Sequence, residues 1–170
     1  MIKLNLDLRS RALKIKLVAF DVDGVMTDGS MIYDQNGLQY KTFNAKDGQG
    51  IAMLVKSGIK TAIITAKESG AVKCRFEDLG MTKLYMGQKN KSLALQEMVK
   101  EFNLDYSEVA YMGDDLPDIA VLREVGLACC PNDAVSEVKS ICHFISAKRG
   151  GGGAIRELTD LIYKTQSKNQ

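Results

Sequence analysis

The chain has 170 residues, enough for one domain with a hydrophobic core and too few for two domains of ordinary size. An apolar fraction of 45% and a charged fraction of 26% are typical of a globular protein, and a net charge of +2 argues against a nucleic-acid binder. No apolar stretch approaches the roughly 20 residues of a membrane span, and no signal peptide is evident. The four cysteines lack metal-ligand spacing. We therefore expect a cytoplasmic protein with reduced thiols and no membrane partner.

The pattern along the chain predicts one α/β domain over residues 15–165, preceded by an amphipathic lead-in at residues 1–14. Strands are predicted at residues 15–21, 60–65, 83–86, 108–113, 126–129 and 142–145. Helices are predicted at residues 47–57, 69–79, 90–103, 117–124, 134–139 and 152–164. Strands that alternate with helices indicate βαβ units and therefore a parallel sheet.

Residues 30–43 depart from this alternation and predict a β-hairpin. Asn36-Gly37 lies between two short alternating segments and is the strongest short hairpin signal. The alternating apolar residues of these segments are Met31, Tyr33, Leu38 and Tyr40. An isolated hairpin is marginally stable in water, so we expect this one to pack against another subunit.

Two acidic clusters each follow an apolar strand. Asp21 and Asp23 come after the first strand, and Asp114 follows the apolar run 109–112. The carboxyl ends of parallel strands meet at one edge of a sheet, where α/β proteins bind ligands. Carboxylates gathered there need a cation, a shared proton or a substrate. Either cluster alone has a simpler reading as turn residues. Two clusters at strand ends favour a hard metal with oxygen ligands, most plausibly Mg²⁺.

Four segments resemble the motifs of haloacid-dehalogenase-type phosphatases, in the same order. Asp21-Val22-Asp23-Gly24-Val25 resembles the DxDGV/T signature, and residues 113–118 resemble the last motif. Ile63-Ile64-Thr65 is similar to the hydroxyl motif, and Lys91 to the lysine motif. The resemblance spans residues 15–163 and implies a three-layer, Rossmann-like fold.

Two further segments narrow the resemblance. Residues 41–48 and 149–157 are similar to 3-deoxy-manno-octulosonate-8-phosphate phosphatases. These are small members without a separate cap domain that act on sugar-acid phosphates. The resemblance implies that the hairpin at residues 30–43 replaces the cap and that the protein forms a homotetramer. It also implies hydrolysis of that phosphate in lipopolysaccharide synthesis.

The resemblance assigns roles to five residues. Asp21 is the expected nucleophile, which forms an aspartyl-phosphate, and Asp23 is the expected general acid and base. The side chains of Asp21 and Asp114, with the Asp23 backbone carbonyl, are expected to bind Mg²⁺. Thr65 is expected to hydrogen-bond a phosphoryl oxygen, and Lys91 to neutralise phosphate charge.

Substrate contacts are expected from a larger set. They are Asp23, Phe43, Asn44, Ala45, Lys46, Asp47, Lys67, Arg75 and Lys91. Lys46 and Lys67 stand where the family usually has arginine, and a lysine is the poorer bidentate partner for a carboxylate. A nine-carbon, sialic-acid-type 9-phosphate is therefore an alternative substrate.

Several alternatives stay open at this point. Asp115 is expected to orient Lys91 or a metal-bound water, and Asp118 to cap the following helix. The glycine-rich run 149–153 is either a linker or a mobile segment that brings Arg149 to an active site. A non-catalytic tetramerising module is a further possibility. A response-regulator receiver fits less well, because it places its phosphorylated aspartate after a middle strand.

Overall fold

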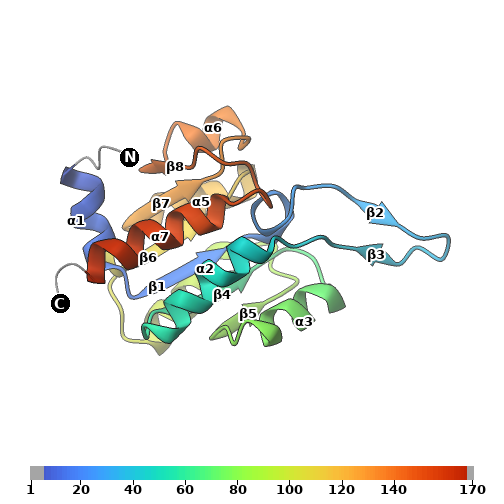
Figure 1. The fold of residues 1–170 in the computed structure, drawn as a ribbon, viewed down its shortest axis with the longest axis horizontal. Coiled ribbons are helices and arrows are strands. Elements are labelled where there is room, and N and C mark those ends of the chain that lie inside the picture. The colour runs from blue at the N-terminus through green and yellow to red at the C-terminus, as the bar shows by residue number, and fades with distance from the viewer. Residues whose placement is uncertain (1–5, 168–170) are drawn as a thin grey trace.

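The computed structural model describes residues 6–167 and has a central sheet of six parallel strands (Figure 1). The strands lie in the order β5-β4-β1-β6-β7-β8. Their bounds are β1 Leu17–Phe20, β4 Lys60–Ile64, β5 Lys83–Tyr85, β6 Val109–Met112, β7 Leu127–Cys130 and β8 Phe144–Ile145. All six predicted strands are confirmed; β7 is shifted by one residue along the chain, and the other five are shorter than predicted. Phe20 is in register with Ile63 and Met112, so β1, β4 and β6 end at the same edge.

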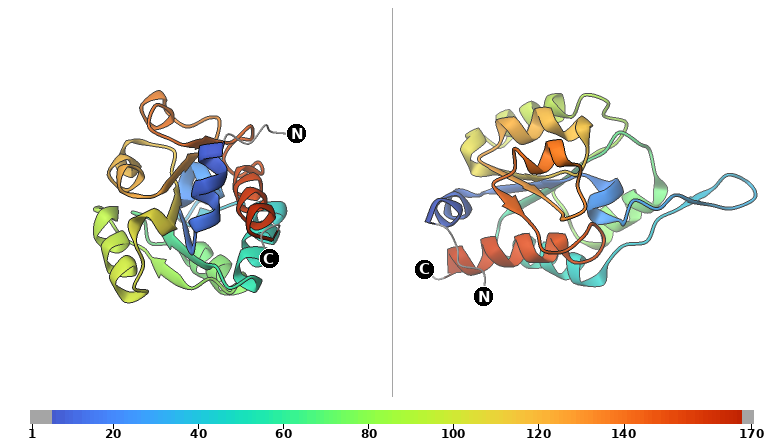
Figure 2. Two further views of the ribbon diagram at one scale, coloured as in Figure 1. Left: turned by 90° about the vertical axis from the view of Figure 1, so that its left-hand side faces the viewer. Right: turned by 90° about the horizontal axis from the view of Figure 1, so that it is seen from above.

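Helices cover both faces of the sheet and complete a three-layer α/β fold (Figure 2). One face carries α1 (Leu6–Lys14), α2 (Ala45–Lys56), α3 (Gly70–Asp78) and α7 (Ala154–Ser167). The other carries α4 (Lys91–Glu101), α5 (Ile119–Glu124) and α6 (Ser136–Lys139). Alternation along β1 explains the two cores, because Val18 and Phe20 pack into the first and Leu17 and Ala19 into the second. The predicted fold class is confirmed.

The lead-in segment forms a helix that the sequence pattern did not predict. In α1, the Arg11 guanidinium donates to the Gly126 carbonyl at 2.7 Å. The side-chain amide of Gln166 donates to the carbonyls of Ala12 and Ile15 at 3.0 and 2.8 Å. These contacts fix α1 beside α7, far from the hairpin (Figure 1). Residues 1–5 of the predicted lead-in lie outside the described residues.

Some predicted helix bounds are wrong. The predicted helix at residues 117–124 is a 3₁₀ turn, Leu116–Asp118, followed by α5. Two other short helical turns, Val22–Met26 and Tyr106–Glu108, lie in loops.

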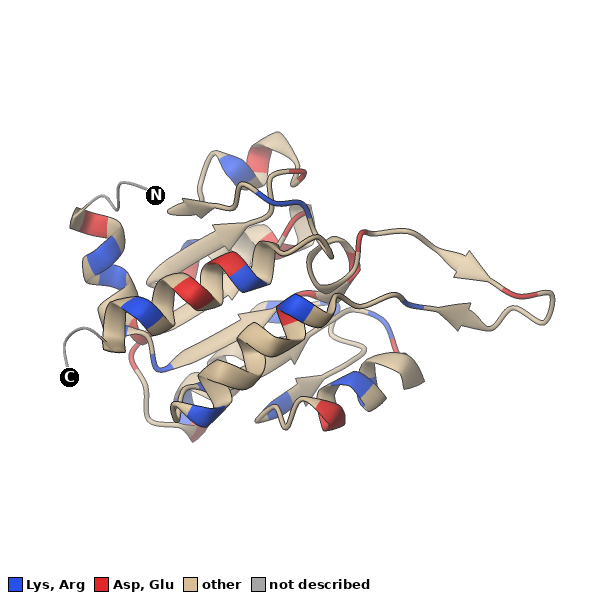
Figure 3. Ribbon diagram, in the orientation of Figure 1, with Lys and Arg blue, Asp and Glu red and all other residues tan. Residues whose placement is uncertain are grey.

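Acidic and basic residues are interspersed along α7 (Figure 3). Within residues 6–167 no helix has the length and apolar character needed to cross a membrane.

The predicted hairpin is confirmed and projects from the carboxyl edge of the sheet (Figures 1 and 2). Its strands, β2 (Ile32–Tyr33) and β3 (Gln39–Tyr40), pair antiparallel. The turn is closed by Asp34, and Gly37 takes the left-handed conformation with φ +80°. The apolar side chains of the hairpin, namely Met31, Ile32, Tyr33, Leu38 and Tyr40, are between 42% and 60% exposed. Packing against another subunit stays a prediction.

Candidate active site

Three adjacent strands bring the predicted site residues to one edge. Asp21 directly follows β1, Thr65 directly follows β4, and Asp114 lies two residues beyond β6. Since β1 lies between β4 and β6, Asp21 is the central residue of the three. Its backbone N–H donates to the Met112 carbonyl at 3.0 Å, which fixes the strand end.

Lys91 occupies the first position of α4 and turns inward. Its side chain is 4% exposed, and its ammonium lies 2.8 Å from Oδ1 of Asp21 and 2.7 Å from Oδ1 of Asp118. The buried Tyr111 hydroxyl also donates to Oδ1 of Asp118, at 2.6 Å. Burial alone would lower the pKa of Lys91, but the two carboxylates outweigh it and raise the pKa. Lys91 is therefore a fixed positive charge against the expected nucleophile.

The structure exchanges the roles predicted for Asp115 and Asp118. Asp118 orients Lys91, and its Oδ2 accepts the backbone N–H groups of Asp114 and Asp115 at 3.0 and 3.3 Å. Its side chain makes no cap bond to α5. Asp115 instead caps the 3₁₀ turn by accepting the next backbone N–H at 2.7 Å. The predicted contact of Asp115 with Lys91 and the predicted cap by Asp118 are wrong, because the turn folds Asp118 back under Gly113, where an added Cβ would lie 2.4 Å from the carboxyl carbon of Asp118. A role of Asp115 toward a metal-bound water stays a prediction.

Two carboxyl groups at the site resist ionisation. Burial is the main cause that raises the pKa of Asp21 to about 6, and the Asp118 charge adds to it against the opposing effect of Lys91. Burial and then the charges of Asp21 and Asp118 raise the pKa of Asp114 to about 7. The site concentrates negative charge that a cation would stabilise.

The geometry fits a divalent metal. Carboxylate oxygens of Asp21, Asp114 and Asp118 lie within 4.8 Å of one another. The two oxygens of Asp118 already accept hydrogen bonds. Oδ1 of Asp114, in contrast, is buried and has no hydrogen-bond partner among the described residues. Gly24 leaves space beside it, because an added Cβ would lie 2.0 Å from Oδ2 of Asp114. Asp21 and Asp114 therefore fit Mg²⁺, which prefers carboxylate oxygens, while the Asp23 carbonyl ligand stays a prediction.

Thr65 lies at the adjacent strand end with its hydroxyl turned to the loop that follows. The residue is 3% exposed, and its hydroxyl oxygen accepts the Lys67 backbone N–H at 3.4 Å. Its hydroxyl proton can still be donated, as a phosphoryl oxygen would require.

Asp23 faces two lysines. The ammonium of Lys41 contacts Oδ1, and that of Lys67 lies 3.5 Å from Oδ2. Lys67 was predicted as a substrate residue, but Lys41 was not predicted for the site. A lysine at the end of a hairpin strand is usually a surface residue, so its only signal in the sequence is its place at the start of the segment 41–48.

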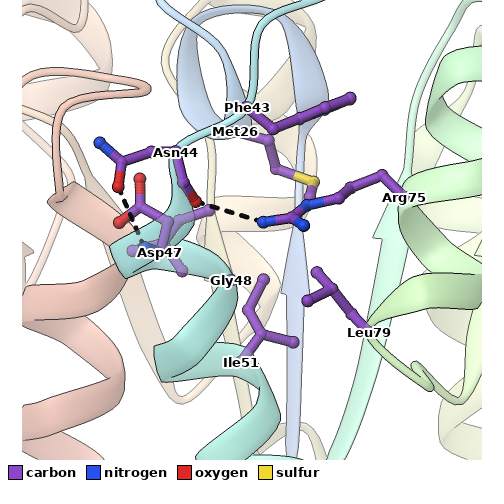
Figure 4. Close-up of a pocket in the computed structure, with 9 residues that line it drawn as sticks. Met26, Phe43, Asn44, Asp47, Gly48, Ile51, Arg75 and Leu79 are labelled. Atoms are coloured by element: carbon purple, nitrogen blue, oxygen red, sulfur yellow. Dashed lines mark hydrogen bonds between the residues drawn. The ribbon is translucent and has the colours of Figure 1, made fainter.

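The predicted substrate segment is held by contacts within the protein (Figure 4). Asn44 caps α2 by accepting the backbone N–H groups of Lys46 and Asp47 at 2.8 and 3.3 Å. Arg75 donates to the Asn44 carbonyl at 3.2 Å, and its guanidinium carbon lies 5.8 Å from the centre of the Phe43 ring. Arg75 thus ties α3 to this segment.

Three other predicted substrate residues occupy different surroundings. Ala45 and Lys46 are exposed, whereas Asp47 is 3% exposed. The Asp47 carboxylate accepts the backbone N–H of Gly153 at 3.3 Å and that of Arg156 at 2.8 Å. Burial raises the pKa of Asp47 against these hydrogen bonds. The structure therefore places Asp47 at the start of α7, where its oxygens serve as a cap.

The glycine-rich run packs against the loop after β1. The Gly151 N–H donates to the Val25 carbonyl at 3.0 Å, and an added Cβ on Gly150 would lie 1.8 Å from the Gly24 carbonyl oxygen. Arg149 is exposed. The run thus packs closely against the loop after β1, unlike a free linker, while an approach of Arg149 to substrate stays a prediction.

Comparison with known proteins agrees with this geometry. Residues 80–158 match the haloacid dehalogenase-like hydrolase family. The 3-deoxy-D-manno-octulosonate 8-phosphate phosphatase of Yersinia pestis is 40% identical over 162 residues, which cover 95% of this chain and 87% of that protein.

Two solved structures are also similar. A probable YrbI family phosphatase from Pseudomonas syringae is 44% identical with a TM-score of 0.93, over 95% of this chain and 92% of that one. The Moraxella catarrhalis 3-deoxy-D-manno-octulosonate 8-phosphate phosphatase, in complex with magnesium ion, phosphate ion and KDO, is 39% identical with a TM-score of 0.92, over 94% of this chain and 92% of that one. The chain therefore belongs to the 3-deoxy-D-manno-octulosonate 8-phosphate phosphatase family of haloacid dehalogenase-like hydrolases.

Proposed function

We propose that the protein is a Mg²⁺-dependent phosphatase that hydrolyses 3-deoxy-D-manno-octulosonate 8-phosphate during lipopolysaccharide sugar synthesis. The observation that carries this proposal is the contact of Asp21 with the buried Lys91, beside an Asp114 oxygen that has no hydrogen-bond partner within residues 6–167. The Moraxella catarrhalis relative with magnesium, phosphate and KDO supports the same assignment.

The first half-reaction transfers the phosphoryl group to the protein. A carboxylate oxygen of Asp21 attacks phosphorus while the bond to the sugar oxygen breaks, and Asp23 donates a proton to that leaving oxygen. Asp21 and Asp114 would hold Mg²⁺, which shields the repulsion between carboxylate and phosphate and stabilises the charge that develops. Lys91 and the Thr65 hydroxyl serve the same purpose on the protein side.

The second half-reaction releases phosphate. Asp23, now ionised, takes a proton from water as the water oxygen attacks phosphorus and the bond to Asp21 breaks. Asp23 thereby regains the proton that it gave to the sugar, and Asp21 returns as a carboxylate.

The test is phosphate release from a panel of sugar phosphates, measured with Mg²⁺ and with EDTA. We expect metal-dependent preference for the eight-carbon acid phosphate and loss of release in Asp21→Asn. Preference for a nonulosonate 9-phosphate would support the same mechanism with a different substrate. This substrate is included because Lys46 and Lys67 stand where the family usually has arginine. Unchanged release in Asp21→Asn would overturn the enzyme assignment. No release from any substrate with metal bound would favour a tetramerising module.

We also propose that the protein acts in the cytoplasm as a homotetramer. The exposed apolar residues of the hairpin support self-association, because another subunit would cover them. Four free cysteines are consistent with a reducing compartment. Size-exclusion chromatography with light scattering tests the assembly, and a monomer at micromolar concentration would contradict it.

A further inference from the structure

Lys41 directly follows β3 and directs its side chain back into the body of the protein. The side chain is 3% exposed, although the residue lies at the base of a projecting hairpin. Within residues 6–167, the carboxylate of Asp23 is the ion-pair partner that the structure gives to this ammonium. A buried ammonium is unfavourable unless it is paired, so the placement of Lys41 depends on Asp23.

The two oxygens of Asp23 have different surroundings. Oδ1 contacts the buried ammonium of Lys41, whereas Oδ2 lies 3.5 Å from the ammonium of Lys67, whose side chain is 49% exposed. Oδ1 is therefore held by a buried partner, and Oδ2 by a partner that is half exposed. A carboxyl group can accept a hydrogen bond at one oxygen while the other carries a proton. The contact with Lys41 therefore fixes one oxygen of Asp23 and involves Oδ1 alone.

We propose that Lys41 is a positioning residue that holds Oδ1 of Asp23, so that Oδ2 delivers and later recovers the catalytic proton. The inference rests on the proposed function, because it takes Asp23 as the general acid and base. The proton leaves Oδ2 for the ester oxygen as the phosphorus–sugar bond breaks, and Oδ2 takes a proton from water in the second step. A general acid acts only within hydrogen-bond reach of its target, and small displacements lower the rate strongly.

Two substrates with different leaving groups distinguish the positioning role of Lys41 from a purely structural role. A sugar alkoxide needs a proton to leave, whereas p-nitrophenolate leaves without one. We expect Lys41→Met to lower kcat for the eight-carbon sugar-acid phosphate by about 100-fold, the scale of a positioned general acid. The KM should change by less than about threefold, because the interaction matters only in the transition state. The kcat/KM for p-nitrophenyl phosphate should fall far less.

A double-variant cycle tests whether Lys41 acts through Asp23. Because Lys41 has no other proposed role, Asp23→Asn with Lys41→Met should be as slow as Asp23→Asn alone. The inference would be overturned if the kcat losses of the two single variants multiply in the double variant. It would also be overturned if Lys41→Met lowers kcat/KM equally for both substrates, or raises KM while kcat stays unchanged. Lys56→Met, at the exposed end of α2, removes a surface lysine and is the matched control with unchanged kinetics.

The same cycle separates failure of this inference from failure of the proposed function. If Asp23→Asn turns over normally, the role of Asp23 in the proposed function is wrong, and the inference falls with it. If Asp23→Asn is slow and Lys41→Met is not, the inference alone is overturned. If thermal melting shows that Lys41→Met does not fold, Lys41→Gln replaces it in the double-variant cycle, with the same expected and contradicting results.

Discussion

Gly24 and Gly37 share a left-handed backbone but have different surroundings. Their φ angles are +87° and +80°, a region that disfavours side chains. An added Cβ on Gly24 would lie 2.0 Å from Oδ2 of Asp114, while one on Gly37 would meet nothing within 4 Å. Substitutions at these two glycines therefore separate backbone strain from displacement of the expected metal ligand Asp114.

We expect Gly24→Ala to lower Mg²⁺-dependent phosphate release by about 100-fold, because displacement of Asp114 disturbs the site. Gly37→Ala should cost about 1 kcal/mol in the free energy of unfolding and leave turnover unchanged. Turnover and urea unfolding of both variants provide the measurement. Equal turnover in the two variants would show that the approach of Gly24 to Asp114 has no catalytic consequence.

The hydroxyl of the buried Tyr111 donates to Asp118, which is one of the two ion-pair partners of Lys91. Burial and the nearby Asp118 charge raise the pKa of Tyr111 well above its usual value, so its hydroxyl remains a donor to Asp118 at neutral pH. We expect Tyr111→Phe to cost about 1–3 kcal/mol in the free energy of unfolding, because a buried carboxylate loses a donor. Urea unfolding gives the value.

The matched control is Tyr85→Phe, which removes an exposed hydroxyl that donates to Glu97 at 3.0 Å. Its cost should stay within about 0.5 kcal/mol. Similar costs for the two variants would mean that the buried hydrogen bond contributes no more than the exposed one.

At the residue scale, the sequence predicted which side chains gather at the site better than it predicted their orientations. Asp115 and Asp118 are chemically identical and three positions apart, so their roles depend on the 3₁₀ turn between them. That turn forms against Gly113 and the backbone of the site, which no local pattern reports. Lys41 was missed for a similar reason, because only the tertiary fold brings the base of the hairpin to Asp23.

At the scale of elements, α2 and α7 form the support for the active-site loop. The helices approach closely, since an added Cβ on Gly50 would lie 2.1 Å from the Thr159 hydroxyl. Asp47 of α2 caps α7, and the Asn44 side chain donates to the Gly151 carbonyl at 3.0 Å. This packing fixes the glycine-rich run against the loop after β1.

Asp47→Ala tests this support. The first turn of α7 would lose the acceptor for two backbone N–H groups, which should cost about 1–2 kcal/mol in the free energy of unfolding by urea. The KM should change little. Asp105→Ala, which uncaps an exposed turn, is the control and should cost less. A large rise in KM without loss of stability would instead favour the substrate contact that the family resemblance implies.

The secondary-structure elements that a local sequence pattern marks were predicted. The features that depend on tertiary packing, such as α1, were not. The strands were predicted because short apolar runs alternate with helical patterns in the sequence, and two of these runs, β1 and β6, are followed directly by Asp21 and Gly113. The helix α1 was not assigned, because it gains its partners from Gly126 and Gln166, far along the chain. The glycine-rich run looked flexible by composition, yet the small residues allow close backbone contact instead.

At the scale of the whole molecule, the site depends on the strand order. Periodicity predicts parallel strands but does not say which are neighbours, so the meeting of Asp21, Thr65 and Asp114 followed from the strand-end argument and the family resemblance together. The order β4-β1-β6 places these three strand ends side by side. The concentrated charge there also links global stability to pH and metal.

Metal-free protein should become less stable as pH rises from 5 to 8. The pKa values of Asp21 and Asp114 are raised in the folded protein to about 6 and about 7 from an ordinary 3.8, so between these values the folded state binds more protons than the unfolded state. The free energy of unfolding must then fall with pH across that window. Stabilisation by Mg²⁺ should grow over the same window, because the metal would bind the ionised forms of these two carboxyl groups.

Melting temperatures with Mg²⁺ and with EDTA test this coupling. We expect the difference between the two to be small at pH 5 and largest at pH 8, where both carboxyl groups are ionised. Asp114→Asn removes one of the charges and should weaken both the pH dependence and the Mg²⁺ effect, while Asp105→Asn, on the exposed turn, should alter neither. A Mg²⁺ shift of equal size at both pH values would mean that the metal stabilises the fold at some other place than this carboxylate pair.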